Sequence, residues 1–188
     1  MLWNAIDSRF PILHVDDSHN DRNLVKEAIV LTNTPFAVFE ADGMESAMAY
    51  FTQHLQPALV LLDYDMGQHT GADFLHWLRT VKKQVSTPIV MFSGSVGDSH
   101  VEECYGFGAD YFIRKPKEFA RFKAIVCALH ASLANHQPDP IFQLQEYRPH
   151  PSAHAETWCA AACALPTANE SMSAGGNCQS TLKAIGDC

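Results

Sequence analysis

The sequence predicts an α/β fold, a doubly wound parallel sheet of five strands that alternate with five helices. Two observations support this prediction. Short apolar segments alternate with segments whose apolar residues recur every three or four positions, the period of a helix with one buried face. One short segment, ALVLL at residues 58–62, is apolar at every position, which is typical of a parallel strand covered by helices on both faces. The strict alternation of predicted strands and helices therefore favours a parallel sheet.

The first two strand and helix units fall in the N-terminal part of the chain. Residues 12–15 predict a short strand, and residues 20–31 predict a helix. Residues 36–41 and 44–54 repeat this arrangement. The apolar faces of the two helices consist of Leu24, Val25, Ala28 and Ile29, and of Ala47, Met48 and Phe51.

Three further units follow the same pattern of a strand and then a helix. They are residues 58–62 and 71–81, residues 89–92 and 99–107, and residues 111–113 and 118–134. Prolines mark the edges of apolar segments, where the missing backbone N–H does no harm. These prolines are Pro11, Pro35, Pro57, Pro88 and Pro116.

The charge balance of the 188 residues is acidic, with 13 Lys and Arg against 21 Asp and Glu, for a net charge of −8. Nucleic-acid binding depends on clustered cations, so no nucleic-acid partner is expected. No apolar run approaches the roughly 20 residues that span a bilayer, and the first ten residues lack the apolar stretch of a signal peptide. We therefore expect a cytoplasmic protein without a membrane segment, whose six cysteines are thiols.

The composition changes near residue 137. Residues 10–136 form the predicted folded domain, whereas residues 137–188 are rich in Ala, Ser, Asn and Pro and show no sustained period. We expect this C-terminal tail to be disordered. Its four cysteines, Cys159, Cys163, Cys178 and Cys188, lack the close pairs of common zinc modules. A tail this short and without a basic helix favours protein contact over DNA binding as the output.

Polar residues follow four of the predicted strands. Asp16 and Asp17 follow the first, Asp63 the third, Ser93 the fourth and Lys115 the fifth. In open α/β sheets ligands bind beyond the carboxyl ends of the strands, so these side chains are expected to converge. If the strand order is 2-1-3-4-5, the first and third strands are neighbours and the acidic pair lies beside Asp63.

Three carboxylates in one small pocket raise one another's pKa unless a cation neutralises them. Oxygen ligands without nearby Cys or His favour Mg²⁺, which is typically completed by water and phosphate. With Mg²⁺ and Lys115 present, Asp63 becomes a plausible phosphoryl acceptor, and Ser93 could donate a hydrogen bond to a phosphoryl oxygen.

The chain resembles the receiver domains of two-component response regulators, similar to the single-domain, CheY-like chemotaxis regulator. The matching stretches are ILHVDD, LVLLDYDM with Gly71 eight residues after Asp63, PIVMFSG and GADYFIRKP, within about residues 10 to 135. The stretches PILHVDDSHNDRNLVKEAI and DGMESAMAYF are also similar to small regulators paired with bacterial phytochrome kinases. The resemblance implies a flavodoxin-like sheet of order 2-1-3-4-5.

The resemblance also implies a role for each matched position. Asp63 would be the phosphoacceptor and a metal ligand, with Mg²⁺ bound directly by Asp17, largely through water by Asp16, and by the backbone carbonyl of Asp65. Ser93 and Lys115 would hold the phosphoryl oxygens.

The resemblance implies that Ser93 and the aromatic switch residue Phe112 couple phosphorylation to a conformational change. Inward rotation of Phe112 would accompany movement of the Ser93 loop. Phosphorylation would be read out on the face formed by the fourth helix, the fifth strand and the fifth helix. The implied partners are a histidine kinase or histidine phosphotransfer protein and a downstream protein target, and a homodimer is compatible with this interpretation. Such a protein is not an enzyme beyond its own phosphotransfer and autodephosphorylation.

One position departs from the family pattern, because Met66 is followed by Gly67 where the family usually has Pro. Glycine gives that loop more conformational freedom, so we expect an altered phosphoryl lifetime. The acidic Asp65 could disfavour an incoming anion or orient the hydrolytic water.

Two alternatives remain open at this point. Asp63 and Asp65 after an apolar strand, with Ser93 and a later Lys, also resemble haloacid-dehalogenase-type phosphohydrolases, although those enzymes place the pair on the first strand. The other alternative is a pseudo-receiver, a binding module that is never phosphorylated.

Gly43 and Gly71 are interpreted as turn residues, and the ten histidines as surface or core residues without ligand spacing.

Overall fold

Five parallel strands form the central sheet in the order β2-β1-β3-β6-β7. The computed structural model describes residues 10–53, 56–83, 86–94 and 97–135. The strands of this sheet are β1 (Phe10–Val15), β2 (Phe36–Ala41), β3 (Leu59–Leu62), β6 (Ile89–Ser93) and β7 (Tyr111–Arg114). When only the five strands of this sheet are numbered along the chain, the order is 2-1-3-4-5, the flavodoxin-like order expected from the sequence.

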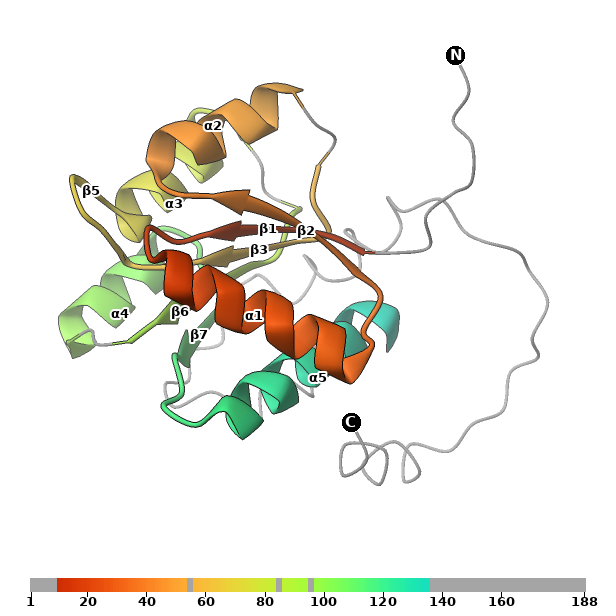
Figure 1. Ribbon diagram of the computed structural model, residues 1–188. Coiled ribbons are helices and arrows are strands. Elements are labelled where there is room, and N and C mark those ends of the chain that lie inside the picture. Colours follow the sequence, from red (N-terminus) through yellow and green to blue (C-terminus); the bar gives the residue numbers. More distant parts are fainter. Residues whose placement is uncertain (1–9, 54–55, 84–85, 95–96, 136–188) are drawn as a thin grey trace, which may run out of the picture.

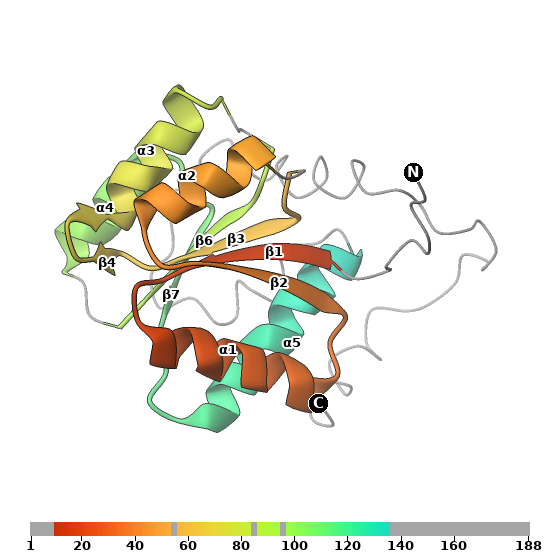
Figure 2. The ribbon, with the colours of Figure 1, turned by 45° about the horizontal axis from the view of Figure 1, so that its top comes forward.

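Helices cover both faces of the sheet (Figure 1). They are α1 (His19–Thr32), α2 (Met44–Gln53), α3 (Gly71–Thr80), α4 (Asp98–Gly106) and α5 (Phe119–Asn135). Figure 2 shows α1 and α5 side by side on one face, with α2 and α3 on the other. Every predicted helix and long strand is present, with ends that differ by at most two residues among the described positions.

Two apolar layers hold the sheet between the helices. One layer joins the strands to α1 and α5 through residues such as Val25, Phe92 and Phe122. The other joins them to α2, α3 and α4, and contains the fully buried Phe74 and Phe112. The central strand β3 is buried along its whole length, as its unbroken apolar sequence predicts.

Backbone hydrogen bonds continue the parallel pairing past the ends of the strands. Asp63 N donates to the Val15 carbonyl at 2.9 Å, and Asp16 N donates to the Ala41 carbonyl at 3.0 Å. Lys115 N donates to the Ser93 carbonyl at 2.9 Å. The residues that follow β1, β3 and β7 are therefore fixed at one edge of the sheet, together with Ser93 at the end of β6.

A short hairpin between β3 and α3 is not predicted by the sequence pattern. Its strands are β4 (Asp65–Met66) and β5 (His69–Thr70), each of two residues, paired antiparallel. Strands this short have no readable period. Gly67, at the turn, has a φ of 77°, so the residue that replaces the family's usual proline occupies a conformation that favours glycine.

The predicted tail, residues 137–188, and its four cysteines lie outside the described residues. The cysteines within the described ranges, Cys104 and Cys127, are buried and form no disulfide, as expected of thiols. Among the residues that the structure describes, no helix has the length and apolar character needed to cross a membrane.

Candidate functional site

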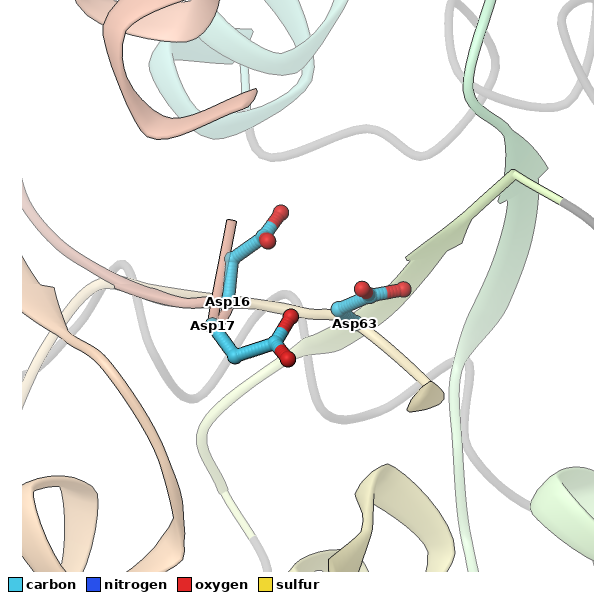
Figure 3. A group of neighbouring side chains, drawn as sticks. All are labelled: Asp16, Asp17 and Asp63. Atoms are coloured by element: carbon cyan, nitrogen blue, oxygen red, sulfur yellow. The ribbon is translucent and has the colours of Figure 1, made fainter. Parts of the chain in front are cut away.

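Three carboxylates from two neighbouring strands meet at the edge of the sheet. Asp16 and Asp17 follow β1, and Asp63 follows β3. Each offers one oxygen, and these oxygens lie within 4.8 Å of one another (Figure 3). Asp16 and Asp63 are buried, whereas Asp17 is exposed. The pairing of β1 with β3 thus brings together the three carboxylates that the sequence predicts as a site.

Lys115 extends from the end of β7 into this cluster. Its Nζ donates a hydrogen bond to Asp63 Oδ2 at 3.0 Å and another to Asp21 Oδ2 at 2.8 Å. Nζ also lies 2.8 Å from Asp16 Oδ2, an ion pair without the alignment of a hydrogen bond. The side chain of Lys115 is only 9% exposed, so its charge is poorly screened by water.

Charges and burial shift the pKa values of these groups in different directions. Burial raises the pKa of Asp63 and Asp16 raises it further, although Lys115 and a hydrogen bond from Ser93 act in the opposite sense. Burial alone would raise the pKa of Asp16, but His14 and Lys115 more than offset it, and the net pKa is lowered. Burial alone would lower the pKa of Lys115, but the surrounding carboxylates raise it overall. The carboxylates therefore stabilise the protonated form of Lys115.

The other predicted residues lie around this cluster. Ser93 is buried at the end of β6, beside Lys115, which directly follows the neighbouring strand β7. Phe112 is fully buried on β7 and faces Met91 in register, so its ring already lies inside the protein. The Asp65 side chain is exposed on β4 and does not join the carboxylate cluster, which leaves only its backbone carbonyl as a candidate ligand.

The interpretation of Gly71 as a turn residue is corrected by the structure. Gly71 is the first residue of α3, and its N–H donates to the Tyr64 carbonyl at 2.7 Å. A Cβ at this position would lie 2.1 Å from the carbonyl oxygen of Asp63. Glycine is needed because helix α3 approaches the backbone of Asp63 too closely for any side chain.

Two residues at the site are not predicted from the sequence. Asp21, in the first turn of α1, bonds Lys115, although a carboxylate at that position normally signals only a helix start. His14 is fully buried in β1, with Nε2 3.4 Å from Asp16 Oδ2. Its buried position in an apolar strand agrees with the expectation of a surface or core role, but no sequence signal indicates its proximity to the carboxylates.

The donor set fits a divalent cation. The candidate ligands are the carboxylates of Asp16, Asp17 and Asp63. The Lys115 ammonium pairs with Asp16, Asp63 and the additional carboxylate of Asp21. Asp16 Oδ2 is buried and makes no aligned hydrogen bond among the described residues, where its closest partner is the Lys115 ammonium at 2.8 Å. The cluster carries more carboxylate charge than one ammonium neutralises, and a hard cation with oxygen ligands would offset the remainder.

Comparison with known proteins identifies similar chains. The family described as "Response regulator receiver domain" matches residues 12–127. The two-component response regulator ORR13 of Oryza sativa subsp. japonica is 26% identical over 109 residues, which cover 58% of this chain and 88% of that protein.

Solved structures of response regulators share the fold. The phosphorylated cyanobacterial phytochrome response regulator RcpA superposes with a TM-score of 0.60 at 22% identity, covering 66% of this chain and 94% of that one. The Mn²⁺-bound form of response regulator Rcp1 gives a TM-score of 0.57 at 21% identity, covering 75% and 99%. A phytochrome regulator is thus among the similar structures, as the sequence predicts.

Proposed function

The chain belongs to the response regulator receiver domain family, and from this premise we propose that Asp63 accepts a phosphoryl group from a phosphohistidine of a partner protein. The donor would be a histidine kinase or a histidine phosphotransfer protein. The observation that supports this most directly is the meeting of Asp16, Asp17, Asp63 and Lys115 at one edge of the sheet.

The proposed cofactor is Mg²⁺, held by Asp17 and Asp63, by Asp16 largely through water, and by the backbone carbonyl of Asp65. When bound, the cation supplies positive charge that offsets the carboxylates and the incoming phosphoryl oxygens. The hairpin of β4 and β5 supports the role of Asp65, because its pairing with Thr70 fixes the backbone two residues after Asp63.

In the proposed transfer, a carboxylate oxygen of Asp63 forms a bond to phosphorus. The phosphorus–nitrogen bond of the phosphohistidine breaks, and the departing imidazole nitrogen keeps the electron pair. Lys115 and Ser93 would donate hydrogen bonds to phosphoryl oxygens, and both lie next to Asp63 before any transfer occurs. Such fixed donors contribute through positioning and charge, which are the main requirements of phosphoryl transfer.

We propose that the output surface is the face formed by α4, β7 and α5, where a downstream protein would bind. Ser93 and Phe112 lie on the neighbouring strands β6 and β7. Because the ring of Phe112 is already buried, phosphorylation would stabilise this inward position rather than create it. Tyr64, the residue after Asp63, also contacts α4, since its hydroxyl lies 3.3 Å from Glu103 Oε2.

The test is phosphorylation with a small donor. The full-length protein is incubated with Mg²⁺ and acetyl phosphate, and its intact mass is followed over time. We expect one phosphoryl adduct in the unaltered protein and none in Asp63→Asn. Glu102→Gln, which removes an exposed carboxylate on α4, is the control and should be phosphorylated normally.

Two results would contradict the proposal. Absence of an adduct at every time point would support the pseudo-receiver alternative. Catalytic turnover of a small phosphate ester would support a phosphohydrolase instead, because a receiver only accepts and loses its own phosphoryl group.

A further inference from the structure

The ammonium of Lys115 is held by a carboxylate that does not belong to the metal-binding cluster. Asp21 Oδ2 accepts a hydrogen bond of 2.8 Å from Lys115 Nζ, whereas the cluster of candidate ligands consists of Asp16, Asp17 and Asp63. Asp21 comes from α1, so it approaches Lys115 from an element that carries none of the candidate ligands. Lys115 therefore has one anchor outside the reacting groups.

On the proposed function, the partners of Lys115 change when the cation and a phosphoryl group occupy the site. Asp63 becomes an acyl phosphate and loses its carboxylate charge. Asp16 Oδ2, which now forms only an ion pair with Lys115, would be drawn to the cation. Of the three carboxylates that pair with Lys115, Asp21 is then the one that is bound neither to a phosphoryl group nor to the cation.

The local structure of α1 places Asp21 for this task. Ser18 is the N-cap residue of α1, and its side chain accepts a hydrogen bond of 3.3 Å from the Asp21 backbone N–H. The cap fixes the backbone of Asp21, and a short side chain loses little conformational freedom when it binds. The Asp21 side chain is 30% exposed and that of Lys115 is 9% exposed, so the bond forms at the boundary of the buried site.

We propose that Asp21 is a positioning residue that keeps the Lys115 ammonium directed at the phosphoryl group when Asp16 and Asp63 are engaged elsewhere. It touches neither the phosphoryl group nor the metal, and it acts only through Lys115. Because a hydrogen bond to a charged group is stronger than one between neutral groups, loss of this anchor should weaken binding of a phosphoryl mimic about tenfold, which corresponds to about 1.4 kcal/mol.

The experiment measures trifluoroberyllate, which mimics a bound phosphoryl group, by calorimetric titration of the full-length protein in the presence of Mg²⁺. Asp21→Ala removes the anchor, and we expect about tenfold weaker binding. Asp21→Asn keeps an acceptor oxygen, so binding should fall only about threefold. Glu27→Ala and Glu27→Gln change an exposed carboxylate on the same helix and should bind like the unaltered protein.

A titration with Mg²⁺ alone separates positioning from a damaged site. For Asp21→Ala we expect the affinity for Mg²⁺ to fall much less than the affinity for trifluoroberyllate. Equal losses for both ligands would indicate a structural role and overturn the proposal. Unchanged or tighter trifluoroberyllate binding in both Asp21 variants would also overturn it, because it would show that Asp21 repels the anion. Failure of the unaltered protein to bind trifluoroberyllate would instead refute the proposed function, and this inference with it.

Discussion

Replacement of Gly71 by alanine tests the close packing of α3 against the acceptor. The added Cβ would lie 2.1 Å from the Asp63 carbonyl oxygen and 3.0 Å from both the carbonyl carbon and Met91 Cε. An ordinary contact begins at 3.4 Å, so the first turn of α3 must move by about 1 Å relative to the backbone of Asp63. This shift would also stretch the hydrogen bond from Gly71 N to the Tyr64 carbonyl.

The expected loss of stability follows from the type of atoms in contact. Overpacking of a protein interior costs about 1 to 3 kcal/mol, and the upper end applies where the obstructing atoms are backbone. We therefore expect Gly71→Ala to lower the free energy of unfolding by about 3 kcal/mol, or the Tm by roughly 10 °C. Because Asp63 moves too, its phosphorylation by acetyl phosphate should slow.

The assay is urea unfolding followed by circular dichroism, with Gly106→Ala as the matched control. Gly106 is the last residue of α4, and a Cβ there would meet no atom within 4 Å. Since alanine favours a helix over glycine, this control should be as stable as the unaltered protein or up to about 1 kcal/mol more stable. Equal stability of Gly71→Ala and Gly106→Ala, with unchanged phosphorylation, would refute the close-approach argument.

Three other outcomes are expected. Arg79→Met should lower the free energy of unfolding in urea by about 3 kcal/mol, because it removes the cation that lies 3.0 Å from the buried carboxylate of Asp110. A loss below about 1 kcal/mol would contradict this. MgCl₂ at about one hundred times its Kd should stabilise the protein by about 2.7 kcal/mol in thermal unfolding, and Asp17→Asn should abolish most of this gain; an equal gain in both proteins would exclude Asp17 as a ligand. Burial lowers the pKa of His130 from 6.5, so its contribution to stability is present above pH 6.5 and is lost as the pH falls below that value. Urea unfolding should therefore show a weaker pH dependence in His130→Phe than in the unaltered protein, and identical pH profiles would contradict the assignment.

The fold and the central cluster were predictable because both follow from short-range patterns. The alternation of apolar segments predicts a parallel sheet, and a parallel sheet places the residues after its strands at one edge. Asp16, Asp17 and Asp63 therefore converge as predicted, with Ser93 and Lys115 beside them.

The remaining features depend on tertiary contacts that leave no local pattern. Asp21 follows an N-cap and has the sequence context of an ordinary helix start, so its bond to Lys115 becomes visible only when α1 is placed against β7. Gly71 could be read as a turn residue because the requirement for glycine comes from Asp63, eight positions earlier. The hairpin of β4 and β5 has strands too short to show any period.

The most direct test of the central claim identifies the residue that carries the phosphoryl group. The protein is phosphorylated with acetyl phosphate and Mg²⁺ and then treated with borohydride, which reduces an aspartyl phosphate to homoserine. Peptide mass spectrometry locates the change. We expect homoserine at position 63 and unmodified aspartate at positions 16, 17 and 21. Homoserine at any of those three positions instead, or none in the chain, would contradict the assignment of Asp63 as the phosphoryl acceptor.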